Sequence, residues 1–477
     1  MQLSQDFIDD MRELLGEAES GQLIASLDEW TPVSVRFNTS KLSQLPSVGT
    51  PIPWDGSAVY LPSRPSFTFD PLFHAGCYYV QEAGSMFVNA VLRQYVTHPV
   101  RMLDLCAAPG GKSTLSASVL PEGSLLVANE VVRQRARILV ENIGKWGIPH
   151  VVVTNNEAAQ FAPFVHAFDV ILTDVPCSGE GMFRKDPKAV DEWSRANVAL
   201  CYQRQRQILS DIWPSLKPGG ILIYSTCTFN THEDEENVWW IARELGAEFL
   251  PVCVHPAWGI TSSLLPGHDM PVYRFLPHKT RAEGFFLAVL RKHGDAPDSF
   301  GSMPAPALRG KSVRASGKTV RSAVSQQELE KVRGWVDIPG SAYEFQPTSD
   351  SVRLFPADHV DFLKFIQSSS LNVLLAGITV ASLKGREFVP HHALALTTVL
   401  RRDAFPLVEV DYAMAVAYLR GEALQLPGDF PRGFVLLTYR HHPIGFCKNL
   451  GVRANNLYPQ EWRIHSSHVP DVSPSFI

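Results

Sequence analysis

Between residues 101 and 292, short apolar runs alternate with longer amphipathic stretches. Six runs have the length and composition of buried strands: Arg101–Leu105, Ser124–Asn129, His150–Thr154, Phe168–Thr173, Ile221–Ser225 and Gly284–Leu290. Helical patterns separate them over 111–120, 132–146 and 196–216, and a further acidic helix begins near Glu233. Strands and helices in turn predict a doubly wound α/β domain built on a mainly parallel sheet.

The flanking regions follow other patterns. Residues 1–95 combine a helix over 7–15, an alternating strand over 33–38, a proline- and serine-rich loop or edge strand over 47–71, and a helix over 85–94. This predicts a small α+β domain. Residues 293–325 are rich in Gly, Pro, Ser and Ala, with five cations and no acid between Arg309 and Arg321, which is typical of a basic linker. Residues 326–477 contain short β-like runs over 351–355, 371–378 and 433–439, which predict a further small domain. The α/β domain described above is therefore expected over 96–292, between these flanking regions.

Composition narrows the functional classes only slightly. The chain of 477 residues is 19% charged and 45% hydrophobic with a formal net charge of −5, which does not indicate a nucleic-acid binder, so any basic surface must be local. No basic and apolar leader or membrane-length apolar run is apparent, and the seven scattered cysteines have neither disulfide-framework nor metal-ligand spacing. We therefore expect a cytoplasmic, monomeric protein with reduced thiols, no metal and no membrane contact.

Three strand ends carry polar or nucleophilic residues. They are Asp104 to Lys112, Asp174 to Cys177 (Asp-Val-Pro-Cys) and Tyr224 to Thr228 (Tyr-Ser-Thr-Cys-Thr). Carboxyl ends of parallel strands share one edge of the sheet, where ligands bind. Two cysteines and an aspartate at that edge indicate covalent chemistry.

The small-residue loop from Asp104 to Lys112 allows three interpretations. A P-loop needs glycine where Cys106 stands, and the dinucleotide pattern Gly-x-Gly-x-x-Gly is absent. The third is a sheet that binds S-adenosylmethionine, in which an acid at the end of the next strand holds the ribose hydroxyls. Glu130 stands at that position and favours this interpretation over a merely tight turn.

Longer motifs around these strand ends resemble a known family. Leu-Cys-Ala-Ala-Pro-Gly-Gly-Lys (105–112), Asp-Val-Pro-Cys-Ser-Gly-Glu-Gly-Met-Phe-Arg-Lys-Asp-Pro (174–187) and Tyr-Ser-Thr-Cys-Thr-Phe-Asn (224–230) are similar to RNA cytosine-5 methyltransferases of the Nop/Sun family, bacterial RsmF type. The resemblance runs from about residue 5 to the tail, where Asn-Asn-Leu-Tyr-Pro-Gln-Glu-Trp-Arg-Ile (455–464) matches the family's C-terminal domain. It implies a Rossmann-like class I S-adenosylmethionine-dependent methyltransferase domain with a PUA-like, β-rich RNA-binding domain at the C-terminus.

The resemblance also implies roles for individual residues. Cys227 is the expected nucleophile, Cys177 assists release, and Asp174 contacts the base as a proton donor. The residues expected to hold S-adenosylmethionine are Cys106, Ala107, Ala108, Pro109, Gly110, Gly111, Lys112, Glu130, Arg135, Asn156, Glu157 and Asp174. The family often has aspartate at Glu157, Cys106 has no evident chemical task, and Lys112 could instead lie on an exposed first turn. The other four cysteines, Cys77, Cys201, Cys253 and Cys447, are expected to be buried.

The reaction explains why such a site needs a thiolate. Carbon 5 of cytosine is a poor nucleophile until a thiolate adds to carbon 6, and protonation of ring nitrogen 3 stabilises the resulting charge. The implied substrate is small-subunit ribosomal RNA or the small subunit itself. Transfer RNA, or a non-catalytic role in ribosome assembly, are the alternatives. Candidate RNA contacts are Arg36, Arg184, Lys185 and Lys188, the basic linker, and the C-terminal cluster Arg440, His441, His442, Lys448, Arg453 and Arg463, each of which could equally be an ordinary solvated side chain.

Overall fold

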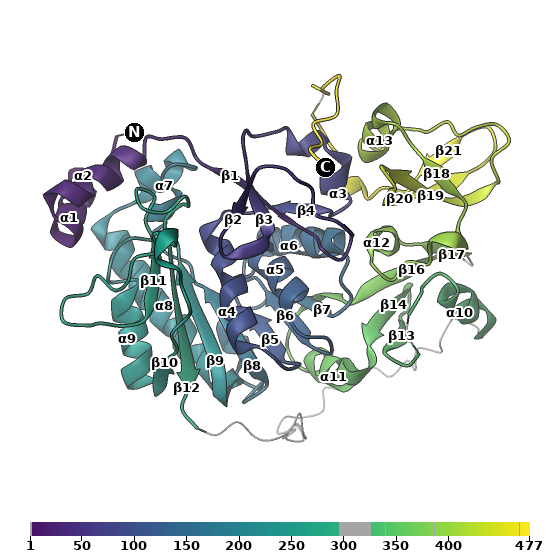
Figure 1. The fold of residues 1–477 in the computed structure, drawn as a ribbon. Coiled ribbons are helices and arrows are strands. Elements are labelled where there is room, and N and C mark those ends of the chain that lie inside the picture. The colour runs from purple at the N-terminus through teal and green to yellow at the C-terminus, as the bar shows by residue number, and fades with distance from the viewer. Residues whose placement is uncertain (1, 295–325, 339, 386, 467) are drawn as a thin grey trace.

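The centre of the molecule is a nine-stranded sheet, seen in a computed structural model that describes residues 2–294, 326–338, 340–385, 387–466 and 468–477 (Figure 1). Its order is β10-β12-β9-β8-β5-β6-β7-β15, and β11 pairs with β12. The strands are β5 (Arg101–Asp104), β6 (Leu125–Asn129), β7 (Val151–Thr154), β8 (Phe168–Asp174), β9 (Leu216–Thr226), β10 (Ala247–Phe249), β11 (Val272–Phe275), β12 (Phe285–Lys292) and β15 (Val373–Ala376). The five strands from β9 to β7 are parallel, so their carboxyl ends share one edge.

Helices cover both faces of this sheet, which confirms the predicted Rossmann-like fold. Every residue of β6 is buried: Leu126 and Ala128 face one hydrophobic cluster, and Leu125 and Val127 face the other. The first cluster receives α4 (Val88–Tyr95), α5 (Gly111–Val119) and α6 (Arg133–Trp146), and the second receives α8 (Arg195–Ile212), α9 (Glu235–Glu244) and α11 (Val360–Ser368). Burial on both faces explains why these strands are continuous apolar runs.

The N-terminal residues form two separate pieces, a helical pair and a small sheet. Helices α1 (Gln5–Leu15) and α2 (Glu17–Ser26) pack through Phe7 and Leu23 against Phe183, which follows the Asp-Val-Pro-Cys segment. The sheet has the order β2-β3-β1-β4, from β1 (Val33–Phe37), β2 (Thr50–Ile52), β3 (Asp55–Leu61) and β4 (Tyr78–Val80), with α3 (Pro71–His74) before β4.

The predicted loop or edge strand over 47–71 is wrong for β3. This strand lies inside its sheet, paired on one side with β1 and on the other with β2. Its last four residues, Ala58 to Leu61, are buried, while prolines and serines cluster before and after it. Because of these flanking prolines and serines, the sequence pattern did not reveal a short, well-packed strand.

The expected linker over 293–325 lies outside the described residues, apart from positions 293 and 294. Beyond it the chain returns to the central sheet, because β15 pairs antiparallel with β7. The run over 371–378, expected in a separate small unit, is therefore divided between β15 and β16 (Ile378–Lys384). Gly377 makes the turn: its φ is +62°, and an added Cβ would lie 2.1 Å from the carbonyl oxygen of Leu354.

The remaining C-terminal residues form two four-stranded sheets, on the right of Figure 1. The first, β13-β14-β16-β17, contains β13 (Tyr343–Pro347), β14 (Ser351–Pro356) and β17 (Glu387–Pro390), flanked by α10 (Gln326–Arg333) and α12 (His392–Leu396). The second, β18-β19-β20-β21, contains β18 (Leu407–Glu409), β19 (Gly433–Tyr439), β20 (His442–Asn449) and β21 (Ala454–Asn456), with α13 (Tyr412–Leu419) packed beside it. Over the ranges described, no helix has both the length and the apolar character to cross a bilayer.

Candidate active site

The two motif cysteines lie side by side at the carboxyl edge of the central sheet. Cys177 follows β8 and Cys227 follows β9, and these strands are parallel neighbours with Asp174 opposite Ser225. The two Sγ atoms are 3.2 Å apart, and the Cys227 backbone N–H lies 3.4 Å from the Cys177 Sγ. Both side chains are partly buried. The parallel register thus brings together two thiols that are 50 residues apart in the chain.

Cys177 is held as a neutral thiol. The hydrogen bond with Cys227 and then burial raise the pKa of Cys177 well above its usual value. A partly buried, protonated thiol 3.2 Å from a second sulfur can donate a hydrogen bond to that sulfur when the second sulfur becomes negative.

An ion pair stands beside the cysteines. The Lys112 Nζ lies 2.7 Å from Asp174 Oδ2, and the Ser225 hydroxyl donates to Asp174 Oδ1 at 2.8 Å. Burial favours a lower pKa for Lys112, but the Asp174 carboxylate outweighs it, and the net shift is upward. Lys112 therefore remains an ammonium group directed at Asp174, with only 14% of its side chain exposed, and does not lie on an exposed first turn.

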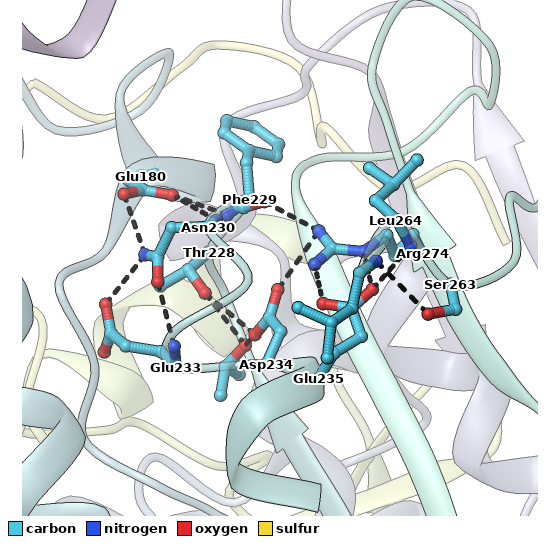
Figure 2. A network of polar contacts seen from close by, with 12 residues as sticks. Glu180, Thr228, Phe229, Asn230, Glu233, Asp234, Glu235, Ser263, Leu264 and Arg274 are labelled. Atoms are coloured by element: carbon cyan, nitrogen blue, oxygen red, sulfur yellow. Dashed lines mark hydrogen bonds and ion pairs between the residues drawn. The ribbon is translucent and has the colours of Figure 1, made fainter. Parts of the chain in front are cut away.

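Two buried glutamates, Glu180 and Glu233, tie the cysteine segments to each other, and Figure 2 shows them with Asn230 between them. Glu180, three residues after Cys177, accepts the backbone N–H groups of Phe229 and Asn230 at 2.6 and 3.0 Å. Glu233, six residues after Cys227, accepts the Ser178 N–H at 3.0 Å. The contact is reciprocal, since each segment supplies the carboxylate that holds the backbone of the other.

Neighbouring side chains complete this arrangement. The Asn230 amide nitrogen donates to both glutamates, at 2.9 Å to Glu180 and 3.0 Å to Glu233. Trp193 Nε1 donates to Glu180 at 2.9 Å, and Gln205 Nε2 donates to Glu233 at 2.7 Å. Burial raises the pKa of Glu233, and these donated hydrogen bonds oppose that rise. Every direct partner of the two carboxylates is a donor.

The acidic stretch from Glu233 to Glu236 lies where the sequence predicts the start of a helix. In the structure its first three carboxyl groups are fully buried. Asp234 accepts the hydroxyls of Thr226 and Thr228, and Arg274, on β11, forms ion pairs with both Asp234 and Glu235 (Figure 2). Periodicity alone could not reveal this role, because the partners lie on other strands.

The loop from Leu105 to Lys112 passes the end of β6 in a fixed conformation. Arg135 Nη2 donates to the Ala108 carbonyl at 2.7 Å, and Asn142 Nδ2 donates to the Pro109 carbonyl at 2.7 Å. Gly110 has a φ of +115°, which a side chain would disfavour. Burial raises the pKa of Cys106, so this thiol stays protonated.

Glu130 and Asp104 place two carboxyl groups near this loop. Glu130 is 2% exposed, and its Oε1 accepts the Val132 N–H at 2.8 Å while Arg135 Nη1 lies 3.5 Å from Oε2. Asp104 Oδ2 accepts the Ser113 hydroxyl at 2.6 Å, whereas its buried Oδ1 has no hydrogen-bond partner among the residues that the structure describes. Burial raises the pKa of Asp104 to about 7. A buried acceptor without a donor suits a bound group that supplies one.

Asn156 and Glu157 differ in their surroundings. The Asn156 side chain is buried, and its Oδ1 accepts the Asn372 N–H at 2.9 Å, so its amide is fixed by the segment just before β15. Glu157 is exposed, and its backbone N–H donates to the Gln160 Oε1 at 2.9 Å. Contact with a cofactor therefore stays a prediction for both residues.

Two of the expected RNA contacts need correction. Arg36 is 2% exposed, donates to Gln81 and Thr114, and lies over the Trp146 ring. Arg184, with 4% of its side chain exposed, pairs with Glu283 at 2.8 Å. Both guanidinium groups are enclosed and hydrogen-bonded, so they stabilise the fold and cannot reach RNA phosphates in this conformation.

Other candidate cations lie at the surface. Lys185 has 29% of its side chain exposed and lies 4.0 Å from Glu283, and Lys188 is exposed. Arg440, His441 and Arg453 of the C-terminal cluster are also exposed, whereas Lys448 pairs with Glu387. Their contact with RNA stays a prediction.

The cysteines outside the motifs are mostly buried, as expected for Cys77, Cys201 and Cys447. Cys253 is exposed, which corrects the expectation for that residue. In the part of the chain that the structure covers, no group of three His, Cys, Asp or Glu side chains is arranged to hold a metal ion.

Family models match three parts of the chain. The model of the 16S rRNA methyltransferase RsmB/F matches residues 95–291, and that of the N-terminal domain of 16S rRNA methyltransferase RsmF matches residues 3–83. The model of the methyltransferase RsmF PUA domain matches residues 405–464, which is the sheet from β18 to β21.

Whole proteins and solved structures agree with these matches. The ribosomal RNA small subunit methyltransferases F of Salmonella heidelberg (strain SL476) and Salmonella typhi are each 30% identical over 480 residues, covering 95% of both chains. A methyltransferase homolog protein from Pyrococcus horikoshii shares 27% identity with a TM-score of 0.52 and covers 61% of this chain and 95% of its own. The structure of NSun6 from Pyrococcus horikoshii with SFG has a TM-score of 0.51 at 22% identity, covers 61% of this chain and 99% of its own, and supports the fold alone. The chain therefore belongs to the RsmF-type family of ribosomal RNA small subunit methyltransferases.

Proposed function

We propose that this protein transfers a methyl group from S-adenosylmethionine to carbon 5 of a cytosine in small-subunit ribosomal RNA, through a covalent bond between Cys227 and the base. The observation that carries the proposal is the pair of sulfurs 3.2 Å apart, beside the Asp174–Lys112 ion pair. One nucleophile, one neutral thiol and one acid–ammonium pair at a single sheet edge suit addition to a ring and later release from it.

The residues around the loop fit S-adenosylmethionine. Glu130, at the end of β6, suits the ribose hydroxyls, and the unpartnered Oδ1 of Asp104 can accept a hydrogen bond from a bound group. The segment from Cys106 to Lys112, together with Arg135, Asn156 and Glu157, would complete the cofactor site. Asp174 would lie between the cofactor and the cytosine base and contact both. When bound, the cofactor supplies an electrophilic methyl group.

The chain's own residues supply the remaining steps. The Cys227 thiol first gives its proton to water, and the thiolate adds to carbon 6 of cytosine. The electron pair of the ring double bond moves towards carbon 5 and nitrogen 3. Asp174 contacts nitrogen 3, and the Lys112 ammonium holds an exchangeable proton 2.7 Å from that carboxyl. After carbon 5 is methylated, a water molecule takes the proton from carbon 5, and the C–H electron pair restores the ring double bond. The Cys227–carbon bond breaks at the same time, and its electron pair returns to the Cys227 sulfur. The neutral Cys177 thiol then donates a hydrogen bond to the departing sulfur.

The relatives' names and the PUA-domain match support small-subunit ribosomal RNA as the substrate. A cytosine must leave its stack to reach these sulfurs, which costs a few kcal/mol. Transfer RNA is the alternative substrate. A non-catalytic assembly factor would not need two thiols in contact. The expected cytoplasmic location, the monomeric state and the choice between free RNA and assembled subunits stay predictions.

Cys177→Ala tests the proposal through the covalent step. With small-subunit ribosomal RNA and S-adenosylmethionine, this variant should accumulate a protein–RNA adduct that survives a denaturing gel, because the departing sulfur loses its donor. Cys227→Ala and the double variant should give no adduct, and Cys253→Ala, at an exposed cysteine outside the site, should behave like the unaltered protein. An adduct that forms without Cys227 would contradict the assignment.

A further inference from the structure

We infer that Glu180 and Glu233 are positioning residues with separate tasks: Glu180 places Cys227 for attack, and Glu233 places Cys177 for release. The inference rests on the proposed function, since it assigns one step of that reaction to each glutamate. It starts from the reciprocal contact between the two cysteine segments, for which we use the name glutamate clamp (Glu180, Glu233 and Asn230).

The clamp holds each cysteine through the backbone that follows it. Glu180 accepts the N–H groups two and three residues after Cys227, and Gly181 N–H donates to the Cys227 carbonyl at 2.8 Å. Glu233 accepts the N–H of Ser178, the residue directly after Cys177. Neither glutamate is within hydrogen-bond range of a sulfur in the structure, so neither is a catalytic residue.

The two carboxylates are not interchangeable with amides. Glu180 accepts from four donors, namely the Phe229, Asn230 and Trp193 N–H groups and the Asn230 amide, and these occupy both of its oxygens. Glu233 likewise accepts on both oxygens from Ser178, Asn230 and Gln205. A glutamine would direct its NH2 group at a donor in either orientation, and the buried donors would lose an acceptor.

The reaction needs both sulfurs in the correct place, so the loss of a hydrogen bond that holds either cysteine segment should slow it. Cys227 directly follows the last residue of β9, and Cys177 stands three residues after the end of β8. The strand therefore fixes each cysteine on one side, and the glutamate clamp fixes it on the other. A displacement of roughly 1 Å in a reacting group can cost about 100-fold in rate. Loss of Glu180 should therefore impair attack, and loss of Glu233 should impair release.

The test separates attack from release with two RNA substrates and the full-length protein. Small-subunit ribosomal RNA carrying 5-fluorocytidine has no proton at carbon 5 to lose, so its adduct reports only attack and methyl transfer. Natural RNA reports release, through the fraction of protein held as adduct during turnover. Cofactor binding by calorimetry and thermal unfolding are measured on every variant to establish that it is folded.

Glu180→Gln should slow trapping on fluorinated RNA by about 10- to 100-fold, with no adduct accumulating on natural RNA. Glu233→Gln should trap fluorinated RNA within about threefold of the unaltered rate but accumulate adduct on natural RNA. Glu180→Asp and Glu233→Asp keep the charge and should recover part of each step, and they serve as the test if a glutamine variant does not fold. Glu236→Gln, three residues after Glu233 and paired with the exposed His232, should change neither readout.

Two other outcomes are distinct. If the unaltered protein forms no adduct on fluorinated RNA, the proposed function is wrong, and the roles inferred for the two glutamates are wrong as well. The second outcome concerns the glutamates alone. If the unaltered protein traps fluorinated RNA, but Glu180→Gln and Glu233→Gln each slow attack and release equally, or slow neither step, the division of tasks between the glutamates is wrong. The proposed function then stands.

Discussion

Asp104 shows how burial sets the state of a single side chain at the end of β5. Its carboxyl group is fully buried, and Ser113 donates to only one of its oxygens. Burial raises the pKa of Asp104 to about 7, whereas the unfolded chain releases this proton near the ordinary aspartate value. Below both values the two states hold the proton equally, and above pH 7 both have released it.

The folded protein should therefore lose stability between about pH 4 and 7 through this group, because only the unfolded state gives up the proton freely in that interval. For the cofactor-free protein we expect a loss on the order of 4 kcal/mol across the interval. Asp104→Asn should remove that part of the pH dependence when unfolding by urea is followed at several pH values. Asp358→Asn, at an exposed position, is the control. Equal pH dependence in the unaltered protein and Asp104→Asn would refute the assigned protonation.

Residues at strand ends were the most predictable part of the site. Cys177, Cys227, Asp174 and Glu130 could be chosen because a parallel sheet brings its carboxyl ends together, whatever the distance along the chain. Glu180 was part of a quoted motif but had no assigned role. Its partners Phe229 and Asn230 contact it only after β8 and β9 have paired, and that information is tertiary.

At the scale of elements, the least predictable feature is the return of the chain to the central sheet. β15 is a four-residue apolar strand far from the predicted catalytic domain, and no local pattern assigns it to one sheet or another. α11, just before it, buries Phe362 against Phe164 and Phe168, with ring centroids 6.3 and 6.0 Å apart. The C-terminal region therefore shares a core with the methyltransferase sheet.

Phe362→Ala tests that shared core. The side chain is 2% exposed and also lies under the Arg101 guanidinium, so truncation should cost about 3–5 kcal/mol of unfolding free energy. Guanidinium unfolding followed by tryptophan fluorescence measures the change. Lys364→Ala, on the same helix with 67% of its side chain exposed, should change stability by less than about 0.5 kcal/mol. A loss below about 1 kcal/mol for Phe362→Ala would show that this contact does not support the sheet.

At the scale of the whole molecule, the N-terminal, catalytic and C-terminal parts meet at a buried junction. Tyr458, after β21, lies 3.3 Å from the His74 ring nitrogen of α3, and Trp462 packs on Lys145 of α6. His392, on α12, contacts both Tyr458 and Trp462. The PUA-domain sheet is thus held against the catalytic domain and the N-terminal sheet by direct contacts.

These contacts join the N-terminal, catalytic and C-terminal parts by direct packing. The sequence patterns predicted the Rossmann-like domain and its flanking units, and they failed where a segment changes sheets, as at Gly377. The expected RNA contacts Arg36 and Arg184 were wrong because both are buried, and exposure cannot be inferred from residue type. Lys188 and Arg453 are exposed, and their contact with RNA stays a prediction.

Bisulfite sequencing of RNA treated with the full-length protein tests the central claim most directly. Small-subunit ribosomal RNA, free and in subunits, and transfer RNA are each incubated with S-adenosylmethionine and either the unaltered protein or Cys227→Ala. The account predicts a cytosine in small-subunit ribosomal RNA that resists conversion only after treatment with the unaltered protein. Protection confined to transfer RNA, or protection that persists in Cys227→Ala, would contradict it.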